Sequence, residues 1–188
     1  ERAVCADLHG DRRDRQLAGR LLRLAVLQRR DHGHDRLRRD DAGDASRAQK
    51  LAKEGFTLAE KIGTRFVLAH GKVSLADALL ALGELDEASR VSREAILLSE
   101  ATGDVFGAAL AHRALAESLA RLRPSDPQWR REIQDSLRIL EDADAQPELA
   151  RSHLSYVRLL NASGDARGAR AHLAQAMDMF RRMDMAWD

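Results

Sequence analysis

The residues of this chain best suited to acid–base or metal chemistry are four histidines: His70, His112, His153 and His172. An imidazole can bind a metal ion or exchange a proton near neutral pH. None of the four has a carboxylate or a cysteine at the i,i+4 spacing that sets two ligands on one helix face, as in the His-Glu-x-x-His motif. His112 and His153 occupy equivalent positions of an internal repeat, which favours a role in packing helices together. The sequence therefore predicts no metal site and no cofactor.

A group of acidic residues, Glu84, Asp86 and Glu87, is the other arrangement that could do chemistry, since neighbouring carboxylates can act as general acid and base. Their place at the start of an expected helix offers a simpler role, because negative charge there stabilises the helix dipole. The sequence contains no G-x-x-x-x-G-K-[ST] phosphate loop, no G-x-S-x-G nucleophile elbow and no G-x-G-x-x-G turn. These observations favour a protein that is not an enzyme.

The composition narrows the class of protein further. Of 188 residues, 44% are hydrophobic but only 4% are aromatic, a mixture that favours helices packed through small residues. The net charge of +1 gives no electrostatic case for direct nucleic-acid binding, and no apolar run is long enough to span a membrane. Cys5 is the single cysteine, which fits a reducing cytoplasm. Because the chain opens with Glu1 and has no signal-peptide pattern, we expect a C-terminal piece of a larger cytoplasmic protein.

Apolar residues at helical spacing predict seven helices and no strand. Glycines or prolines separate these helices, because glycine takes the left-handed turn that ends a helix and proline begins one well. The predicted helices run from Ser46 to Ile62, Phe66 to Leu82, Leu85 to Thr102, Val105 to Leu122, Pro127 to Asp142, Pro147 to Ala162, and Ala166 to Met183.

A forty-residue repeat runs through the middle of the chain. Seven residues recur at this offset: Gly43, Ala48, Leu51, Leu58, Glu60, Gly63 and Phe66 return as Gly83, Ala88, Val91, Leu98, Glu100, Gly103 and Phe106. One helical hairpin cannot bury its own apolar face, so a repeat of this length indicates a stack of hairpins. The repeat therefore predicts an all-α fold of antiparallel helix hairpins over residues 44–188.

Residues 1–43 differ from the rest. Arginine, aspartate and histidine crowd together there, and the repeat's expected apolar helix is replaced by Asp35, Arg36 and Arg39. Two interpretations stay open. The segment is either a divergent, solvated N-terminal cap or the translation of a shifted reading frame, with the native sequence resuming near Ala42.

The repeated turns resemble the tetratricopeptide repeat. In that family a small residue lies in the first helix, glycine ends the turn, and Ala-x6-Ala marks the second helix. One unit matches with Ala76, Gly83, Ala88 and Ala95, and another with Gly164, Ala169 and Ala176. The period is about forty rather than about thirty-four, and the family's first-helix aromatic is replaced by Lys72, His112 and His153. Both departures are similar to the longer repeats of MalT-like regulators and of large bacterial signalling ATPases, some fused to nucleotide cyclase domains.

The resemblance implies a right-handed superhelix whose first helices line a concave groove; a HEAT- or armadillo-like α-solenoid is the alternative. Carried over by position, the groove residues are His70, Val73, Asp77, Leu80, Arg113, Glu117, Arg121, Arg151, Leu154, Arg158 and Asn161. Five of these are arginine or histidine and two are acidic, which would suit an acidic peptide or a C-terminal carboxylate. A merely solvated face is the simpler interpretation.

The resulting expectation is a non-catalytic interaction or sensory module of a bacterial cytoplasmic signalling or transcription regulator. It would bind a protein, a peptide or an attached domain of its parent protein. The alternative is self-association, through an open end of the stack or through the methionine-rich C-terminus. That C-terminal group comprises Met177, Met179, Phe180, Met183, Met185 and Trp187, and packing on the previous hairpin is its other expected role.

Overall fold

The computed structural model describes residues 65–183. It also describes residues 44–47, 49–51, 53–55 and 57, which are all helical. The predicted N-terminal segment 1–43, the glycine at position 63, and the C-terminal Met185 and Trp187 lie outside the described residues.

Six complete helices follow one another: α3 (Arg65–Leu82), α4 (Leu85–Thr102), α5 (Val105–Leu122), α6 (Gln128–Asp142), α7 (Gln146–Ala162) and α8 (Ala166–Arg182). Between residues 65 and 183 there is no strand, so the all-α prediction is confirmed. The predicted bounds of α4 and α5 are correct to the residue, and those of the other four helices differ by one residue at one end.

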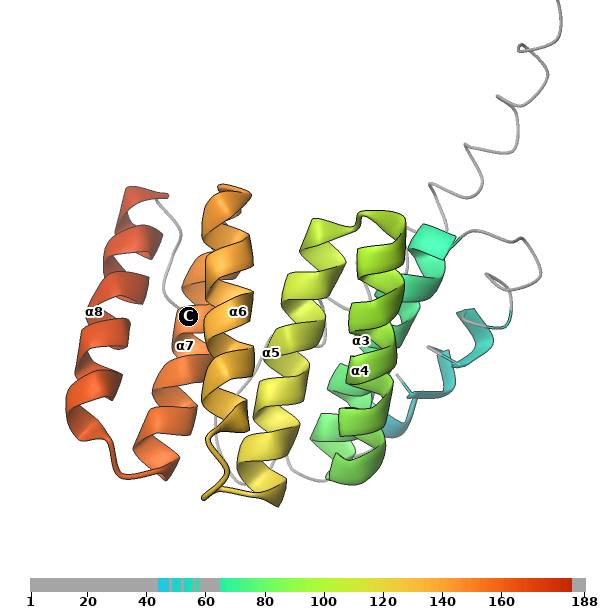
Figure 1. Cartoon of the computed structure of the whole chain (residues 1–188), viewed down its shortest axis with the longest axis horizontal. Coiled ribbons are helices and arrows are strands. Elements are labelled where there is room, and N and C mark those ends of the chain that lie inside the picture. Colours follow the sequence, from blue (N-terminus) through green and yellow to red (C-terminus); the bar gives the residue numbers. More distant parts are fainter. Residues whose placement is uncertain (1–43, 48, 52, 56, 58–64, 184–188) are drawn as a thin grey trace, which may run out of the picture.

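The helices stand side by side in chain order, in a row from α3 to α8 (Figure 1). Each packs against the next helix in the chain, and α5 also contacts both α3 and α7. Among the described helices, the backbones of α4, α6 and α8 do not come close to one another. The row therefore has two layers, an α3/α5/α7 layer whose members touch and an α4/α6/α8 layer whose members are held apart. The handedness of any superhelix stays a prediction.

Three of the turns have the same backbone geometry. Gly83, Gly103 and Gly164 adopt positive φ angles of 80°, 68° and 82°, a conformation that costs glycine little because it has no Cβ. At each turn the two amide groups after the helix bond back to its last carbonyls; the Glu84 amide, for example, donates to Leu79 O at 2.9 Å. This bonding pattern satisfies carbonyls that the helix end leaves unpaired.

The α5–α6 turn departs from this pattern, whereas the α6–α7 turn keeps the same bonding with a residue other than glycine. Arg123 follows α5 with an ordinary negative φ of −139°, and the chain then passes through Pro124 and Pro127 before α6. After α6 the left-handed position is occupied by Asp144, at φ 50°, which is uncommon for a residue other than glycine. Aspartate is among the residues that tolerate this conformation.

Small residues form the contacts between helices. The alanines of the repeat, Ala76, Ala88, Ala95, Ala169 and Ala176, are buried, with 3% exposure or less. Larger side chains fill the space between the hairpins, chiefly Leu115, Leu119, Trp129, Ile133 and Leu160. Burying one such side chain contributes about 1.5–3 kcal/mol.

Trp129 is the largest fully buried side chain. Its indole Nε1 donates to Pro124 O at 3.2 Å, so the proline turn satisfies the one polar group that the ring carries into the core. The Tyr156 ring packs edge-on against Trp129, with 6.3 Å between the ring centroids. The turn that breaks the repeat therefore anchors the middle of the core.

Candidate partner-binding surface

Three of the residues predicted to line a groove are buried: Val73, Leu80 and Arg113 are 4%, 6% and 6% exposed. Val73 and Leu80 pack in the core against alanines of α5, Ala111 and Ala114 respectively. Because alanine lets α3 and α5 come close together, these positions are closed to a partner. Their assignment to a binding groove is corrected here.

Arg113 is held in a buried polar cluster between α5 and α7. Its Nη1 donates to Glu148 Oε2 at 3.0 Å and to Ser152 Oγ at 3.2 Å. Arg151 pairs with the same Glu148 carboxylate from one turn along α7, and Ser136 of α6 lies 3.2 Å from Ser152 Oγ. A buried guanidinium requires such partners, since an unpaired charge in the interior is very costly. The cluster therefore joins three helices rather than meeting a ligand.

No pattern in the sequence singles out Glu148 or Ser152. Glu148 stands in the first turn of α7, directly after Pro147, where its charge has an ordinary role next to the helix N-terminus. Only the register between α5 and α7 places it opposite Arg113, and no spacing in the sequence reveals that register.

Two more of the predicted residues contact neighbouring helices. Arg121 Nη1 donates to Leu80 O of α3 at 2.8 Å. His70 Nδ1 of α3 lies 2.9 Å from Asp104 Oδ2, the carboxylate that caps α5 by accepting a bond from the Gly107 amide. Asp77 is half-buried and has a contact of its own.

The remaining predicted residues gather on adjoining faces of α5 and α7. Glu117 of α5 and Arg158 of α7 form an ion pair at 3.6 Å, and the Arg158 side chain is 58% exposed. On α7 the spacing of Leu154, Arg158 and Asn161 places them along one face of the helix. We call the α5–α7 surface the set Glu117, Arg121, Arg151, Leu154, Arg158 and Asn161, of which Arg121, Arg158 and Asn161 are exposed and the others half-buried.

A second feature is a polar contact that recurs within every described hairpin. Lys72 of α3 meets Glu94 of α4 at 2.6 Å, His112 of α5 meets Glu132 of α6 at 2.8 Å, and His153 of α7 meets His172 of α8 at 2.9 Å. Lys72, His112 and His153 are the residues that stand at the aromatic position of the repeat. The histidines thus pack helices together, as their equivalent positions in the repeat predict.

The His153–His172 contact differs from the other two because neither partner is an acid. Burial, together with the neighbouring His172 as the smaller cause, lowers the pKa of His153 to about 4. Burial also lowers the pKa of His172, against a hydrogen bond to Gln175 and the charge of Asp165, which both raise it. Both rings are therefore neutral at neutral pH, so one Nδ1 carries the proton that the other accepts.

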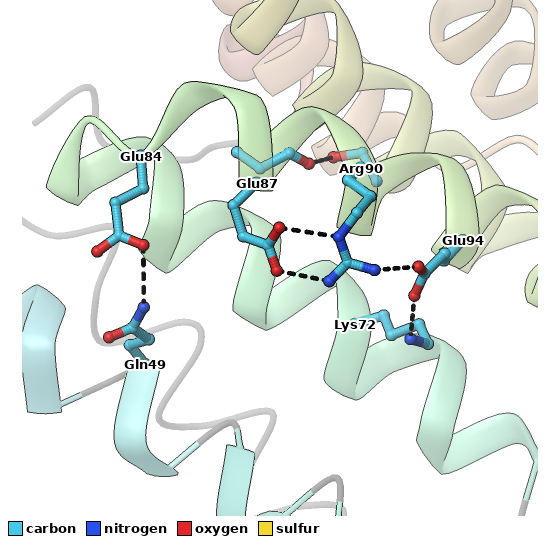
Figure 2. A network of polar contacts seen from close by, with 8 residues as sticks. Gln49, Lys72, Glu84, Glu87, Arg90 and Glu94 are labelled. Atoms are coloured by element: carbon cyan, nitrogen blue, oxygen red, sulfur yellow. Dashed lines mark hydrogen bonds and ion pairs between the residues drawn. The ribbon is translucent and has the colours of Figure 1, made fainter.

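On the α3–α4 hairpin the same position extends into a charged network (Figure 2). Arg90 lies between Glu87 and Glu94 on an exposed face of α4, with its Nε 2.8 Å from Glu87 Oε2, and Lys72 reaches Glu94 from α3. The hydrogen bond from Arg90 is the main cause that lowers the pKa of Glu87. Of the acidic group singled out in the sequence, Glu87 is thus paired with the basic Arg90, and Glu84 accepts from the neutral Gln49 Nε2 at 3.4 Å. Asp86 and Glu87 occupy the first turn of α4.

Among the described residues no three histidine, cysteine, aspartate or glutamate side chains come together as a metal site would require. None of the helices that the structure describes is both long enough and apolar enough to cross a membrane. At the C-terminal end Met179 packs with Leu140 and Leu149 in a core cluster. This contact agrees with the packing role expected for that part of the methionine group.

Comparison with known proteins gives a likeness in fold. No protein-family model matches the chain, and no curated protein matches it. A solved structure that it resembles is the crystal structure of BtubC (BKLC) from P. vanneervenii, with a TM-score of 0.55 and 15% sequence identity. The match covers 93% of this chain and 85% of that one. At such low identity the likeness concerns the fold alone.

Proposed function

We propose that this chain is a non-catalytic, tetratricopeptide-like scaffold module of a bacterial cytoplasmic signalling or transcription regulator. It binds a peptide segment, acidic in character or ending in a free carboxylate, on the α5–α7 surface. The observation that carries the proposal is the exposure of Arg121, Arg158 and Asn161 on α5 and α7, two helices that buried contacts hold together.

Rigid placement supports this role. The Arg113 cluster and the Arg121–Leu80 bond hold α5 against both α7 and α3, so the surface is formed before a partner arrives. A preformed surface loses little conformational entropy on binding. Arginine suits carboxylate recognition because its planar guanidinium can donate two parallel hydrogen bonds.

The charge of the surface decides the kind of peptide. Arg121, Arg151 and Arg158 stand against one carboxylate, that of Glu117, within the α5–α7 surface, although Arg151 also pairs with Glu148. An incoming carboxylate would compete with Glu117 for Arg158, whose ion pair is mostly exposed and therefore weak, about 0–1 kcal/mol. Exchange of one carboxylate partner for another costs little, which favours an acidic ligand.

Fluorescence anisotropy with a labelled peptide of alternating glutamate and glycine, with a free C-terminus, tests the proposal. We expect measurable binding to the unmodified chain, and binding weakened at least about tenfold by Arg158→Glu combined with Asn161→Glu, since about 1.4 kcal/mol corresponds to that factor. A lysine–glycine peptide of the same length is expected not to bind.

The matched control is Arg138→Glu combined with Gln134→Glu on α6. Both residues are exposed, Arg138 makes comparable surface ion pairs, and the total change in charge is the same. This control should bind the acidic peptide as the unmodified chain does. Equal loss in both double variants would mean that the peptide senses net charge only, and the assignment of the surface would be rejected.

Self-association is the second candidate, and the position of α8 favours it. Among the described helices α7 is the one whose backbone lies close to α8, and Ala171 and Ala174 on α8 are exposed. A second copy stacked on α8 would continue the row of helices. Light scattering over a hundredfold range of concentration separates the candidates, because a pure peptide-binding module keeps a constant mass.

A further inference from the structure

His153 of α7 and His172 of α8 form a polar contact between the two helices of the last described hairpin. The two Nδ1 atoms are 2.9 Å apart, and the rings are stacked at 28° with their centroids separated by 5.1 Å. His153 is 7% exposed, and the Tyr156 ring lies against His172 at 4.4 Å between centroids. One ring must donate and the other accept, so the contact exists only while at least one ring is neutral.

The equivalent contacts in the earlier hairpins respond to acid differently. Lys72–Glu94 pairs a cation with a carboxylate, so it cannot become a contact of two positive groups. His112–Glu132 gains attraction when the imidazole takes up a proton, because a positive ring then faces a carboxylate. His153–His172 alone becomes a contact of two positive rings when both are protonated.

We propose that the His153–His172 contact is an acid-sensitive latch, which releases α8 from α7 at about pH 5 while α3 to α6 keep their packing. Protonation of both rings would place two like charges side by side in a buried interface, and separation of the helices relieves that repulsion. The pH dependence of docking follows from the pKa of His153 in the two states. When α8 is undocked, His153 takes up a proton below its ordinary pKa of 6.5, whereas in the docked state it does so only near about 4. Stability of docking is therefore complete above about pH 6.5 and declines as the pH falls between these values.

The groups around the pair do not supply a charge that would cancel the repulsion at both rings. From α8, Asp165 favours the protonated form of His172, and Gln175 accepts a hydrogen bond from it. On the α5 and α7 side, the Glu148 carboxylate is engaged by Arg113 and Arg151. From α6, Ser136 lies against Ser152, and Arg130 bonds Ser163 at the far end of α7. Protonation is therefore less unfavourable at His172 than at His153, which has no such group beside it to offset a second positive charge.

The packing of α8 makes its release feasible. Its fully buried apolar side chains are two alanines, Ala169 and Ala176, whereas α6 buries Trp129, Ile133 and Leu140. Alanine contributes little apolar area, and the larger apolar side chains of α8, such as Met179, are only half-buried. Because α8 lies along α7 at the end of the described row, its departure removes the contact of Met179 with the cluster around Leu140 but leaves the helix pairs from α3 to α6 together.

Hydrogen exchange measured by mass spectrometry at about pH 7.5 and about pH 5 tests the latch in the full 188-residue chain. With rates corrected for the intrinsic effect of pH, protection of α8 should fall about tenfold at the lower pH. Protection of α4 in the same sample should change less than about threefold. Equal protection of α8 at both pH values, or an equal fall in α4 and α8, would overturn the proposal without the use of any variant.

Two substitutions of the half-buried His172 sharpen the test. His172→Gln removes one titrating ring and with it the repulsion between two positive rings, so the fall in α8 protection should become smaller. It should not vanish, because burial still lowers the pKa of His153. His172→Glu recreates the histidine–carboxylate contact of the preceding hairpin, so α8 should become at least as protected at about pH 5 as at about pH 7.5. An α8 that still opens tenfold in acid in the His172→Glu variant would show that another group is responsible.

Discussion

Arg121 of α5 and Leu80 of α3 are joined across the hairpin boundary: the guanidinium Nη1 donates to the Leu80 carbonyl at 2.8 Å, next to the left-handed turn at Gly83. The same carbonyl also accepts the Gly83 amide at 3.2 Å. A positive charge at the C-terminus of a helix offsets the negative end of its dipole. A residue predicted to contact a ligand thus completes the end of a neighbouring helix.

Replacement of Arg121 by alanine should lower the free energy of unfolding by about 1 kcal/mol, since a charged hydrogen bond and a favourable helix-end charge are lost together. Arg121→Lys should recover part of the loss, because the charge remains but the fixed geometry of the guanidinium does not. Urea unfolding followed by circular dichroism measures both. Arg123→Ala, in the exposed turn, is the control and should be neutral; an equal loss there would contradict the assigned role.

Two glycines inside helices should respond to alanine with opposite signs. A Cβ at Gly107 would lie 2.8 Å from Ser99 Oγ and closer still to the Asp104 carboxylate, so the buried cap of α5 would have to move. A Cβ at Gly71 meets nothing within 4 Å. We expect Gly107→Ala to destabilise by about 1–2 kcal/mol through loss of the cap, and Gly71→Ala to stabilise by up to about 1 kcal/mol through helix propensity. Thermal unfolding of both variants checks the difference in sign.

The charge of Asp104 should stabilise the fold in a defined pH range. Burial of this carboxyl works to raise its pKa, but bonding to His70 and to the Gly107 amide outweighs burial and holds the pKa below its ordinary 3.8. The contribution is thus present above about pH 4 and lost as the pH falls through the lowered value. Asp104→Asn keeps a capping oxygen and removes the charge, so it should be less stable than the parent by about 1 kcal/mol at about pH 6 and equal to it near pH 2.

Asp165 offers the matched control for this experiment. It caps α8 by accepting from the Gly168 amide at 2.9 Å, as Asp104 caps α5, but it is less buried. Asp165→Asn should therefore change stability by less than half as much. Urea midpoints measured from about pH 2 to about pH 7 decide the matter, and a pH-independent difference for Asp104→Asn would refute the charge effect.

Replacement of Arg113 and of Glu148 in the buried cluster should lower the free energy of unfolding by different amounts. Arg113→Met leaves the carboxylate paired with Arg151, and the long apolar side chain fills much of the space, so we expect a loss of about 1 kcal/mol. Glu148→Ala leaves the buried Arg113 guanidinium without its carboxylate, which should cost about 3 kcal/mol. Guanidinium chloride unfolding gives both values, and a larger loss for Arg113→Met would mean that the cluster is arranged differently.

The helices could be predicted from the sequence because their end signals are local. Gly103 and Asp104 end one helix and begin the next, and they define the boundary between α4 and α5 without reference to the rest of the fold. Asp144 occupies a left-handed turn at which the sequence offers no glycine, so Pro147 and the neighbouring apolar pattern marked that turn.

The site was harder to predict because it depends on how closely α3, α5 and α7 approach one another. Val73 and Leu80 stand at positions that line a groove in the family they resemble, but here Ala111 and Ala114 let α5 cover them. The burial of Arg113 depends on the same packing, because its partner Glu148 lies on α7, 35 positions further along the chain. Arg158 and Asn161 are exposed because they lie beyond this covered region, and their role in binding a partner stays a prediction.

The turns at Gly83 and Gly103 share one conformation, although the first lies inside a hairpin and the second joins two hairpins. The forty-residue repeat is therefore two similar halves of about twenty, and it has no privileged point of division. A genetic duplication or deletion of one forty-residue period could therefore start at either turn. In both cases the new junction would join a turn and a helix of the kinds already joined in the array. Arrays of this design can change length by recombination without the need to evolve a new interface.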